Sequence, residues 1–526
     1  MQVFITFIGF TAFVAFYSWF RLRKEKLSTQ DGYFLGGRSL TGVVIAGSML
    51  LTNISTEHLI GMNGNAYKNG FIIIAWEVTS ALALVVAATY FLPTYLKMGL
   101  TTIPQYLEER FDATTRTMVA LFLLVSFVVT LLPIVLYTGA INLESIFNIS
   151  EHFGISQEAA LWYTVIAIGC VGSCYAIFGG LKAVAYSDTI NAIGLFLGGL
   201  LVPILALWNI GDGNVWGGLM KVYEHCPEKF NVVGASDSIL PFETLFTGLV
   251  INQLYFWGMN QTIIQRALGA KSLVEAQKGL LITGLLKIFV PVIIVLPGVI
   301  GFYYFGDRFF DNQDLIYPEL IKKVLPLRFV GFFAAVVLGA VLSTFNSVLN
   351  STATIFSMGI YKRLMNPGAN DRQMVRAGKT VSIILAVIAI LTAPLVAGAP
   401  DGLYDLLQQL NGIFFIPIAS VMLAGLFLPK ISAPGAKAAM CVGLVFYISA
   451  EFIFKVEIHY VHIWGIEFVL NMAVMFAVTY FYPNQNPFQP KDKGLVEIEE
   501  WKHTKAFSSI LVLLIVGIYI WLGWLI

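Results

Sequence analysis

Charged residues are scarce in this chain of 526 residues. Only 12% of them are Asp, Glu, Lys or Arg, which is about half the share in soluble globular proteins. The formal net charge is +1, so no strong field of either sign attracts nucleic acid, and we expect no nucleic-acid partner. With 57% hydrophobic residues, the chain needs a solvent other than water. The composition therefore predicts an all-α protein embedded in a lipid bilayer.

Cysteine is also rare, and enzyme motifs are missing. The four cysteines include Cys170 and Cys174, which lie four residues apart in an apolar run and so share one face of a helix. No further His or Cys lies beside them, so we interpret them as packing residues rather than metal ligands. The sequence has no His-rich metal motif, no Gly-x-Ser-x-Gly and no phosphate-binding loop. We therefore expect a protein that is not an enzyme.

Long apolar runs, by contrast, are abundant. A spanning helix needs about 20 largely apolar residues. The run at residues 3–20 is followed by basic residues instead of a cleavage site, which indicates a membrane span rather than a removable signal. We expect about fourteen spans, near residues 3–20, 40–62, 71–93, 117–146, 158–178, 187–208, 244–266, 279–305, 327–361, 378–398, 402–428, 434–453, 458–482 and 507–525.

The Lys and Arg residues set the expected orientation. An even number of spans places both termini on one side. With the termini outside, 23 of the 32 basic residues fall in inside segments and eight fall outside, and Lys287 lies within a span. Because cytoplasmic loops carry the excess of Lys and Arg, we predict a multi-pass protein of the cell (inner) membrane with both termini extracytoplasmic.

Two of the spans carry polar residues at their centres. The second contains Thr52-Asn-Ile-Ser-Thr-Glu-His58, and the seventh contains amides and aromatics around Gly258. Irregular backbone at membrane depth is tolerated only where protein or a water-filled cavity satisfies it. Interrupted spans at matching positions of two halves are typical of transporters built from inverted repeats. The alternative is two kinked helices packed on polar neighbours.

Further polar residues lie in other spans. Glu77 lies in the third span and Lys287 in the eighth, and a charge near the bilayer centre costs roughly 2.5–3.5 kcal/mol on insertion scales. One interpretation is that these two residues only pair with each other. We favour a shared polar cavity, because other polar residues in the spans also need one, namely Asn53, His58, Ser80 and Gln253. In the ninth span, the adjacent hydroxyls of residues 343–344 suit a hard monovalent cation, although Ser and Thr often bond their own helix carbonyls.

Several stretches together resemble the sodium:solute symporter family, and within it the sodium–sugar (glucose/galactose) branch. The stretches are Thr52 to Gly64 (TNISTEHLIGMNG), Gly179 to Asp188 (GGLKAVAYSD), Leu254 to Arg266 (LYFWGMNQTIIQR), Ala270 to Gly279 (AKSLVEAQKG) and Asn350 to Tyr361 (NSTATIFSMGIY). The resemblance implies a five-plus-five inverted-repeat transporter fold, with the broken helices in the second and seventh spans.

The resemblance also implies how the chain is divided. We expect one transmembrane transporter domain over residues 1–526. An extra helix and a cytoplasmic loop fill 1–39, and the first repeat runs over 40–208. The second repeat runs over 244–428, and extra helices fill 429–526.

The resemblance assigns roles to individual residues. Sodium would be held by the carbonyls of Leu51, Ile54 and Ala340 and by the hydroxyls of Ser343 and Thr344. The substrate-binding residues would be Asn53, His58, Glu77, Ser80, Gln253, Trp257, Lys287 and Gln408. The gates would be Met62, Trp76 and Tyr404 on the outer side and Phe256 on the inner side. Asp188 would lie on the exit path of the ion.

These assignments predict sodium-coupled symport of a neutral monosaccharide by alternating access. Ala340 has no hydroxyl where relatives that carry two ions have one, which favours one sodium per sugar. The alternatives are another small solute, such as an inositol, an acidic sugar, an amino acid or a vitamin, or a sodium-dependent sugar sensor. The sequence leaves the oligomeric state open.

Overall fold

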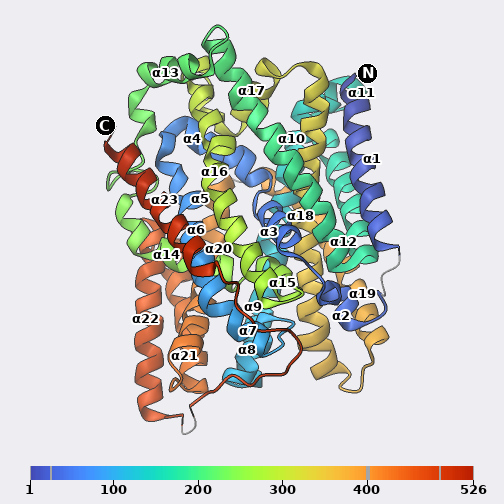
Figure 1. The fold of residues 1–526 in the computed structure, drawn as a ribbon, viewed down its shortest axis with the longest axis vertical. Coiled ribbons are helices and arrows are strands. Elements are labelled where there is room, and N and C mark those ends of the chain that lie inside the picture. The colour runs from blue at the N-terminus through green and yellow to red at the C-terminus, as the bar shows by residue number, and fades with distance from the viewer. Residues whose placement is uncertain (1, 24–26, 399–402, 485–486, 525–526) are drawn as a thin grey trace.

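The chain folds into one bundle of helices. A computed structural model describes residues 2–23, 27–398, 403–484 and 487–524, and within these residues it contains helices and two isolated β-bridges but no strand. The start of α1 (Gln2–Leu22) and the end of α23 (Thr504–Trp524) lie at the same end of the molecule (Figure 1). This arrangement agrees with an even number of spans.

Twelve helices of the described chain are long and apolar enough to cross a membrane, and one of them, Glu57–Lys97, includes the second half of the first broken span. The uninterrupted or kinked spans are α1, the group α5 (Ile74–Val78), α6 (Ser80–Val86) and α7 (Leu92–Lys97), the pair α9 (Ala113–Ser126) and α10 (Leu132–Phe147), α12 (Gln157–Ile210), which holds two spans, α16 (Leu273–Phe305), α18 (Leu327–Ile355), α19 (Asp371–Thr392), α20 (Leu403–Phe427), α21 (Ala433–Tyr447), α22 (Tyr460–Phe481) and α23. Residue 402, in the eleventh expected span, and residue 525, in the last, lie outside the described residues.

The two predicted breaks are present. In the second span, α3 (Gly42–Asn53) ends at Ile54, whose ψ of 97° is extended, and the chain resumes in a π-helical turn, Glu57–Met62, and α4 (Asn63–Asn69). In the seventh span, α14 (Gly248–Gly258) ends before Met259, and α15 (Gln261–Leu268) follows. Each break divides its span into pieces too short to cross alone.

The broken spans run in opposite directions. The backbone N–H of Leu40, just before α3, donates to the Gly269 carbonyl, and the N–H of Lys271, just after α15, donates to the Leu40 carbonyl (3.1 Å each). The start of the first broken span therefore lies beside the end of the second. This is the antiparallel relation that an inverted repeat requires.

The fifth and sixth spans reverse direction at a single residue. Within α12, Gly180 has a φ of 61° and a ψ of −172°, which is left-handed backbone that favours glycine. A β-carbon there would lie 2.8 Å from the Tyr33 carbonyl oxygen, in the short helix α2 (Gln30–Phe34). The turn therefore depends on both the conformation and the small size of glycine.

An irregular segment, residues 487–503, connects α22 to the last span. It lies against the chain near both repeats: the Lys493 N–H donates to the Lys97 carbonyl (3.0 Å), and the Leu273 N–H donates to the Glu497 carbonyl (2.9 Å). The side-chain oxygen of Gln277, on α16, accepts the Trp501 N–H (2.8 Å). These bonds position α23 against α6 and α16.

Candidate functional site

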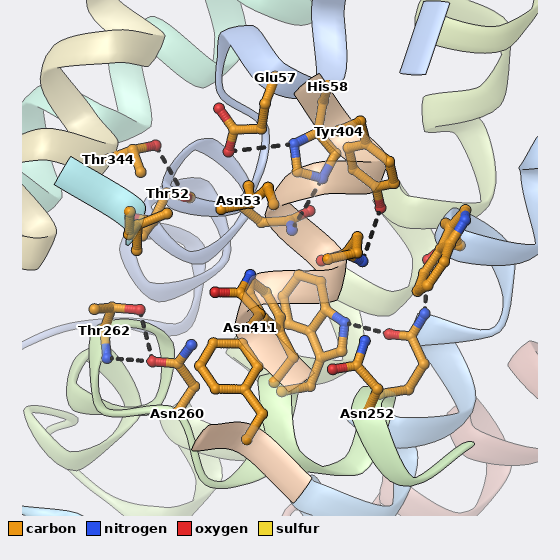
Figure 2. Close-up of a pocket in the computed structure, with 18 of the residues that line it drawn as sticks. Thr52, Asn53, Glu57, His58, Asn252, Asn260, Thr262, Thr344, Tyr404 and Asn411 are labelled. Atoms are coloured by element: carbon orange, nitrogen blue, oxygen red, sulfur yellow. Dashed lines mark hydrogen bonds and ion pairs between the residues drawn. The ribbon is translucent and has the colours of Figure 1, made fainter. Parts of the chain in front are cut away.

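A polar cavity lies between the two breaks. Its volume is about 60 Å³, enough for a few water molecules. The cavity is lined by Thr52, Asn53, Glu57, His58, Trp76, Glu77, Leu131, Asn252, Gln253, Phe256, Trp257, Asn260, Thr262, Lys287, Thr344, Tyr404, Leu407, Gln408, Asn411 and Phe415. Ten of these are labelled in Figure 2, which shows them pointing inward from several helices.

The centre of the cavity wall is a buried ion pair. Lys287, from α16, contacts the Glu77 carboxylate from α5, and both side chains are 1% exposed. The Lys287 Nζ also donates to the Asn53 Oδ1 at the end of α3 (2.6 Å). The ammonium lies 5.4 Å from the centre of the Trp257 ring. Pairing and cavity lining, which the sequence left as alternatives, therefore occur together.

His58 extends this polar chain from the first break. Its Nε2 lies 3.8 Å from Glu77 and 3.5 Å from the Asn53 amide, and its Nδ1 lies 3.6 Å from Glu57 (Figure 2). Glu57 also contacts the Ser55 hydroxyl. Sequence reasoning did not select Glu57, although it precedes His58 in the polar stretch that indicated the break.

The second broken span contributes amides and aromatic rings. The Gln253 Nε2 donates to the Trp76 carbonyl (2.8 Å), and its oxygen accepts the Trp257 indole N–H (3.2 Å). Asn252 and Asn260 from this span and Asn411 from α20 lie opposite His58 in Figure 2. The sequence analysis did not select these three asparagines as site residues. The only signal in the sequence is that each lies within a membrane span, where a polar side chain needs a hydrogen-bond partner.

Aromatic rings close the cavity at two ends. The Tyr404 ring, from α20, lies edge-on to the His58 ring (5.5 Å between centres) and to the Trp76 ring (5.8 Å). Phe256 and Trp257 are also edge-on to each other (5.2 Å). Beyond Tyr404, the Asn65 amide donates to Asp405 (2.9 Å).

Two of the predicted substrate-binding and gate residues lie apart from the cavity. Ser80 begins α6, and its hydroxyl donates to the Glu77 backbone carbonyl instead of pointing inward. Met62 is buried at the end of the π-helical turn and does not contribute to the lining that the described residues form. The roles proposed for these two residues stay predictions.

The candidate sodium ligands lie where α18 meets the end of α3. The Ile54 N–H donates to the Leu50 carbonyl (2.8 Å), and the carbonyls that follow, from Leu51 onward, lie at the helix end, where partners within the helix run out. The Thr344 hydroxyl donates to the Thr52 carbonyl (3.0 Å). The Ser343 hydroxyl is buried and has no hydrogen-bond partner of normal geometry. Carbonyls of unwound backbone with a spare hydroxyl fit a sodium ion.

Asp188 lies beside this group in a second buried network. It is 1% exposed and accepts a hydrogen bond from Ser48 (2.6 Å), which in turn accepts one from the Arg266 Nε (3.1 Å). The Arg266 guanidinium lies 4.0 Å from Asp188 and contacts Ser347, whose hydroxyl is 3.0 Å from that of Thr52. The network therefore joins α3, α12, α15 and α18.

Comparisons with known proteins identify the family to which this chain belongs. The family model described as the sodium:solute symporter family matches residues 33–443. The chain belongs to the sodium:solute symporter family. Sodium is accordingly the coupling ion, and the protein is a multi-pass membrane symporter of a solute.

Individual members of the family are similar over most of the chain. The "Uncharacterized symporter YidK" of Escherichia coli (strain K12) is 44% identical over 98% of this chain and 90% of its own length. The "Sodium/glucose cotransporter" of Vibrio parahaemolyticus is 34% identical over 81% of this chain and 80% of its own.

A solved structure supports the fold. The substrate-bound, outward-open structure of a sodium-coupled sialic acid symporter matches with a TM-score of 0.77 and 20% identity. The match covers 93% of this chain and 99% of that one. At this identity the likeness shows the inverted-repeat fold alone.

Proposed function

We propose that this symporter carries one neutral monosaccharide, a glucose- or galactose-like hexose, together with one sodium ion by alternating access. The observation that carries the proposal is the Glu77–Lys287 pair at the cavity wall, joined to Asn53. The pair has no net charge and offers both a donor and acceptors. A sugar hydroxyl both donates and accepts, so a polyhydroxy neutral solute can use both members of the pair.

The other predicted substrate residues complete such a site. Asn53, His58, Gln253 and Gln408 line the cavity and provide amide and imidazole groups for ring hydroxyls. Trp257 offers an apolar face on which a sugar ring can stack. Tyr404 and Trp76 form the outer gate and Phe256 the inner gate. The roles of Met62, in the second span, as an outer-gate residue and of Ser80, in the third span, as a substrate-binding residue stay predictions.

At about 60 Å³, the cavity is too small for a hexose. Loading therefore requires the outer gate to open, with Tyr404 moving away from His58 and Trp76, followed by closure over the sugar. Sodium bound by the carbonyls of Leu51, Ile54 and Ala340 and by the hydroxyls of residues 343–344 joins α3 to α18. Binding of the ion thus fixes the broken helix that presents Asn53 and His58 to the sugar.

One sodium ion is sufficient to concentrate a sugar. A potential of about 100 mV contributes ~2.3 kcal/mol per charge. A tenfold sodium gradient contributes ~1.4 kcal/mol. The sum limits accumulation to roughly 500-fold. The alanine at position 340 supports this stoichiometry, since it adds no side-chain oxygen.

Proteoliposomes test the proposal. Labelled hexose should accumulate when an inward sodium gradient is imposed and should equilibrate without accumulation when the gradient is absent. Accumulation that is equally high without sodium would refute sodium coupling. A sugar-dependent current without any sugar accumulation would favour a sensor.

The solute class needs a separate test. Glu57 and Glu77 at the cavity disfavour acidic sugars, while myo-inositol offers the same ring hydroxyls as a hexose. A thermal-shift panel of hexoses, inositols, sialic acid and amino acids in sodium should show the largest stabilisation with a hexose. A larger shift with any other member of the panel would reassign the solute and leave the symport mechanism intact.

The proposed orientation places both termini outside the cell membrane. Figure 1 shows α13 (Val215–His225) and α17 (Ile316–Val324) at the same end as the termini and α8 (Ile103–Arg110) toward the other end. Single cysteines placed in α13 should react with an impermeant maleimide on intact cells, and those in α8 should react only after permeabilisation. The reverse pattern would invert the topology.

A further inference from the structure

An open crevice lies between α1 and α12, toward the end of α1 that is remote from the N-terminus. Its volume is about 350 Å³, and most of its wall is apolar. Ala15, Trp19 and Arg23 line it from the side of α1, and Tyr175 and Ala183 line it from α12. Because α1 forms the edge of the bundle, the crevice is separate from the solute cavity at the centre (Figure 1).

The crevice lies at the level where a bilayer meets water. α1 is a membrane span that ends at Leu22, and its last turns carry the large exposed rings of Phe16, Trp19 and Phe20. Aromatic residues are enriched at the interface between a membrane and water, and basic residues often follow the end of a span on one side. The crevice therefore extends from the headgroup region toward the acyl chains.

Two arginines at this end of α1 are positioned by aromatic rings. The Arg23 guanidinium lies 4.4 Å from the centre of the Phe20 ring, and that of Arg21 lies 5.2 Å from the centre of the Tyr186 ring on α12. Among the described residues, neither arginine forms an ion pair with an acid. A guanidinium binds phosphate well, because it can donate two parallel N–H bonds.

An apolar crevice beside two arginines suits an amphiphile with a negative headgroup. We propose that it binds one anionic phospholipid, with the phosphate at Arg21 and Arg23 and one acyl chain between α1 and α12. The apolar wall selects hydrocarbon, which a free phosphate ion lacks. The guanidiniums select a net negative charge, which a zwitterionic lipid does not supply. Basic pockets between membrane helices are a known type of site for anionic headgroups.

The lipid would act on a helix that lies outside the two repeats. α1 packs against α12 and against α18, the helix that carries the hydroxyls of residues 343–344. An acyl chain in the crevice adds contacts to both α1 and α12. A ligand that binds only the folded protein raises its stability, so the bound lipid should raise the thermal unfolding midpoint.

The test uses the purified full-length protein without sugar, so that it does not depend on the proposed transport function. In mixed micelles, the unfolding midpoint is measured while phosphatidylcholine is replaced by phosphatidylglycerol. We expect the midpoint to rise and then to level off as the site fills. Glycerol 3-phosphate, which has the charge but no acyl chain, should produce no rise. An equal rise with glycerol 3-phosphate, or no rise with phosphatidylglycerol, would overturn the proposal.

A double variant tests the headgroup end of the site. Arg21→Gln with Arg23→Gln should lower the apparent affinity for phosphatidylglycerol by about 30-fold, since each basic residue near anionic lipid contributes about fivefold. Lys502→Gln with Lys505→Gln is the matched control, because both lysines are exposed beside the start of α23 and the same charge is removed. The control should titrate as the wild type does. Equal losses in the two double variants would overturn the proposal.

A second variant tests the acyl-chain end. Ala15 is exposed in the wall of the crevice, so Ala15→Trp should fold and fill the crevice while both arginines remain. Native mass spectrometry should find one phosphatidylglycerol retained by the wild type and none by Ala15→Trp, and the rise in the midpoint should disappear with it. Retention of the lipid by Ala15→Trp with an unchanged titration would overturn the assignment of the crevice.

Discussion

The two breaks interrupt the membrane spans in the same way but differ in how their polar groups are satisfied. At the second break, the N–H groups of Met259 and Asn260 both donate to the Tyr255 carbonyl (2.8 Å each), and the Asn260 side chain caps α15 by accepting the Thr262 N–H (3.0 Å). The partners all come from the same segment. The backbone groups at this break are thus satisfied by its own residues, although the Gln261 side chain beside it bonds to the Ile103 N–H (2.8 Å) and the Thr101 carbonyl (3.3 Å).

The first break depends on other helices. Its Asn53 accepts a hydrogen bond from Lys287 of α16, and its Thr52 carbonyl accepts one from Thr344 of α18. Ser343 beside it has a spare hydroxyl. Irregular backbone in a membrane must be satisfied somewhere, and a break that takes its partners from elsewhere can exchange them for a ligand. From this comparison we propose that the first break binds the ion and shares the solute with the side chains of the second broken span, and that the second break acts as a hinge.

We expect the largest loss of sugar uptake when Lys287, which supports the first break, loses its charge. Lys287→Met leaves Glu77 buried without its partner, and breaking a buried pair costs about 3–5 kcal/mol. We expect initial sugar uptake to fall by at least about 100-fold. Uptake is measured in proteoliposomes at matched protein content.

A double variant provides the control. In Glu77→Gln with Lys287→Met, no unpaired charge is left, so folding and expression should improve relative to either single variant. Uptake by Lys287→Met within about twofold of the wild type would contradict the central place given to this pair.

A smaller effect is expected from the ion ligands. Ser343→Ala removes one oxygen and should raise the sodium concentration for half-maximal uptake by about tenfold, which corresponds to ~1.4 kcal/mol. Thr352→Val is the matched control, since Thr352 is buried on the same helix and its hydroxyl donates to the Val348 carbonyl of that helix. Equal sodium dependence in the two variants would remove Ser343 from the site.

The hinge role of the second break is tested by its cap. Asn260→Ala should lower stability by about 1 kcal/mol, and Asn260→Ser should retain most of it, because serine also caps helices. The readouts are the thermal unfolding midpoint and the sodium titration. If Asn260→Ala changed the sodium requirement as much as Ser343→Ala does, the distinction between the breaks would fail.

The smallest effect is expected far from both breaks. Lys221 pairs with Asp212 on the surface (2.8 Å), and both side chains are largely exposed. Exposed pairs contribute little to stability. Lys221→Ala should therefore leave uptake, sodium dependence and the unfolding midpoint unchanged within error, and a clear loss of uptake would indicate a role for this loop that the breaks do not explain.

Much of the fold could be predicted from the sequence, because lipid imposes simple rules. Span length and the free-energy cost of polar groups in lipid predicted the positions of both breaks. They also predicted that Glu77 and Lys287 line one cavity. The same rules cannot say which way a side chain turns. Ser80 lies three residues after Glu77, yet its hydroxyl bonds back to the Glu77 carbonyl, as serine often does in helices.

Other features depend on tertiary contacts that no local pattern encodes. Asn252, Asn260 and Asn411 reach the cavity because α14, α15 and α20 converge there. The π-helical turn at Glu57–Met62 adds an extra residue to the turn and changes which side chains face inward after His58. Met62 could therefore not be placed by counting helical positions.

The reversal at Gly180 has a consequence for the genetics of this protein. Two whole spans depend on one residue whose φ is positive and whose missing β-carbon leaves room for the Tyr33 carbonyl. Every amino acid that a single-base change can put in place of glycine carries a β-carbon. In a library of all point variants selected for growth on the transported solute, position 180 should tolerate no replacement, although it is not among the residues that line the cavity.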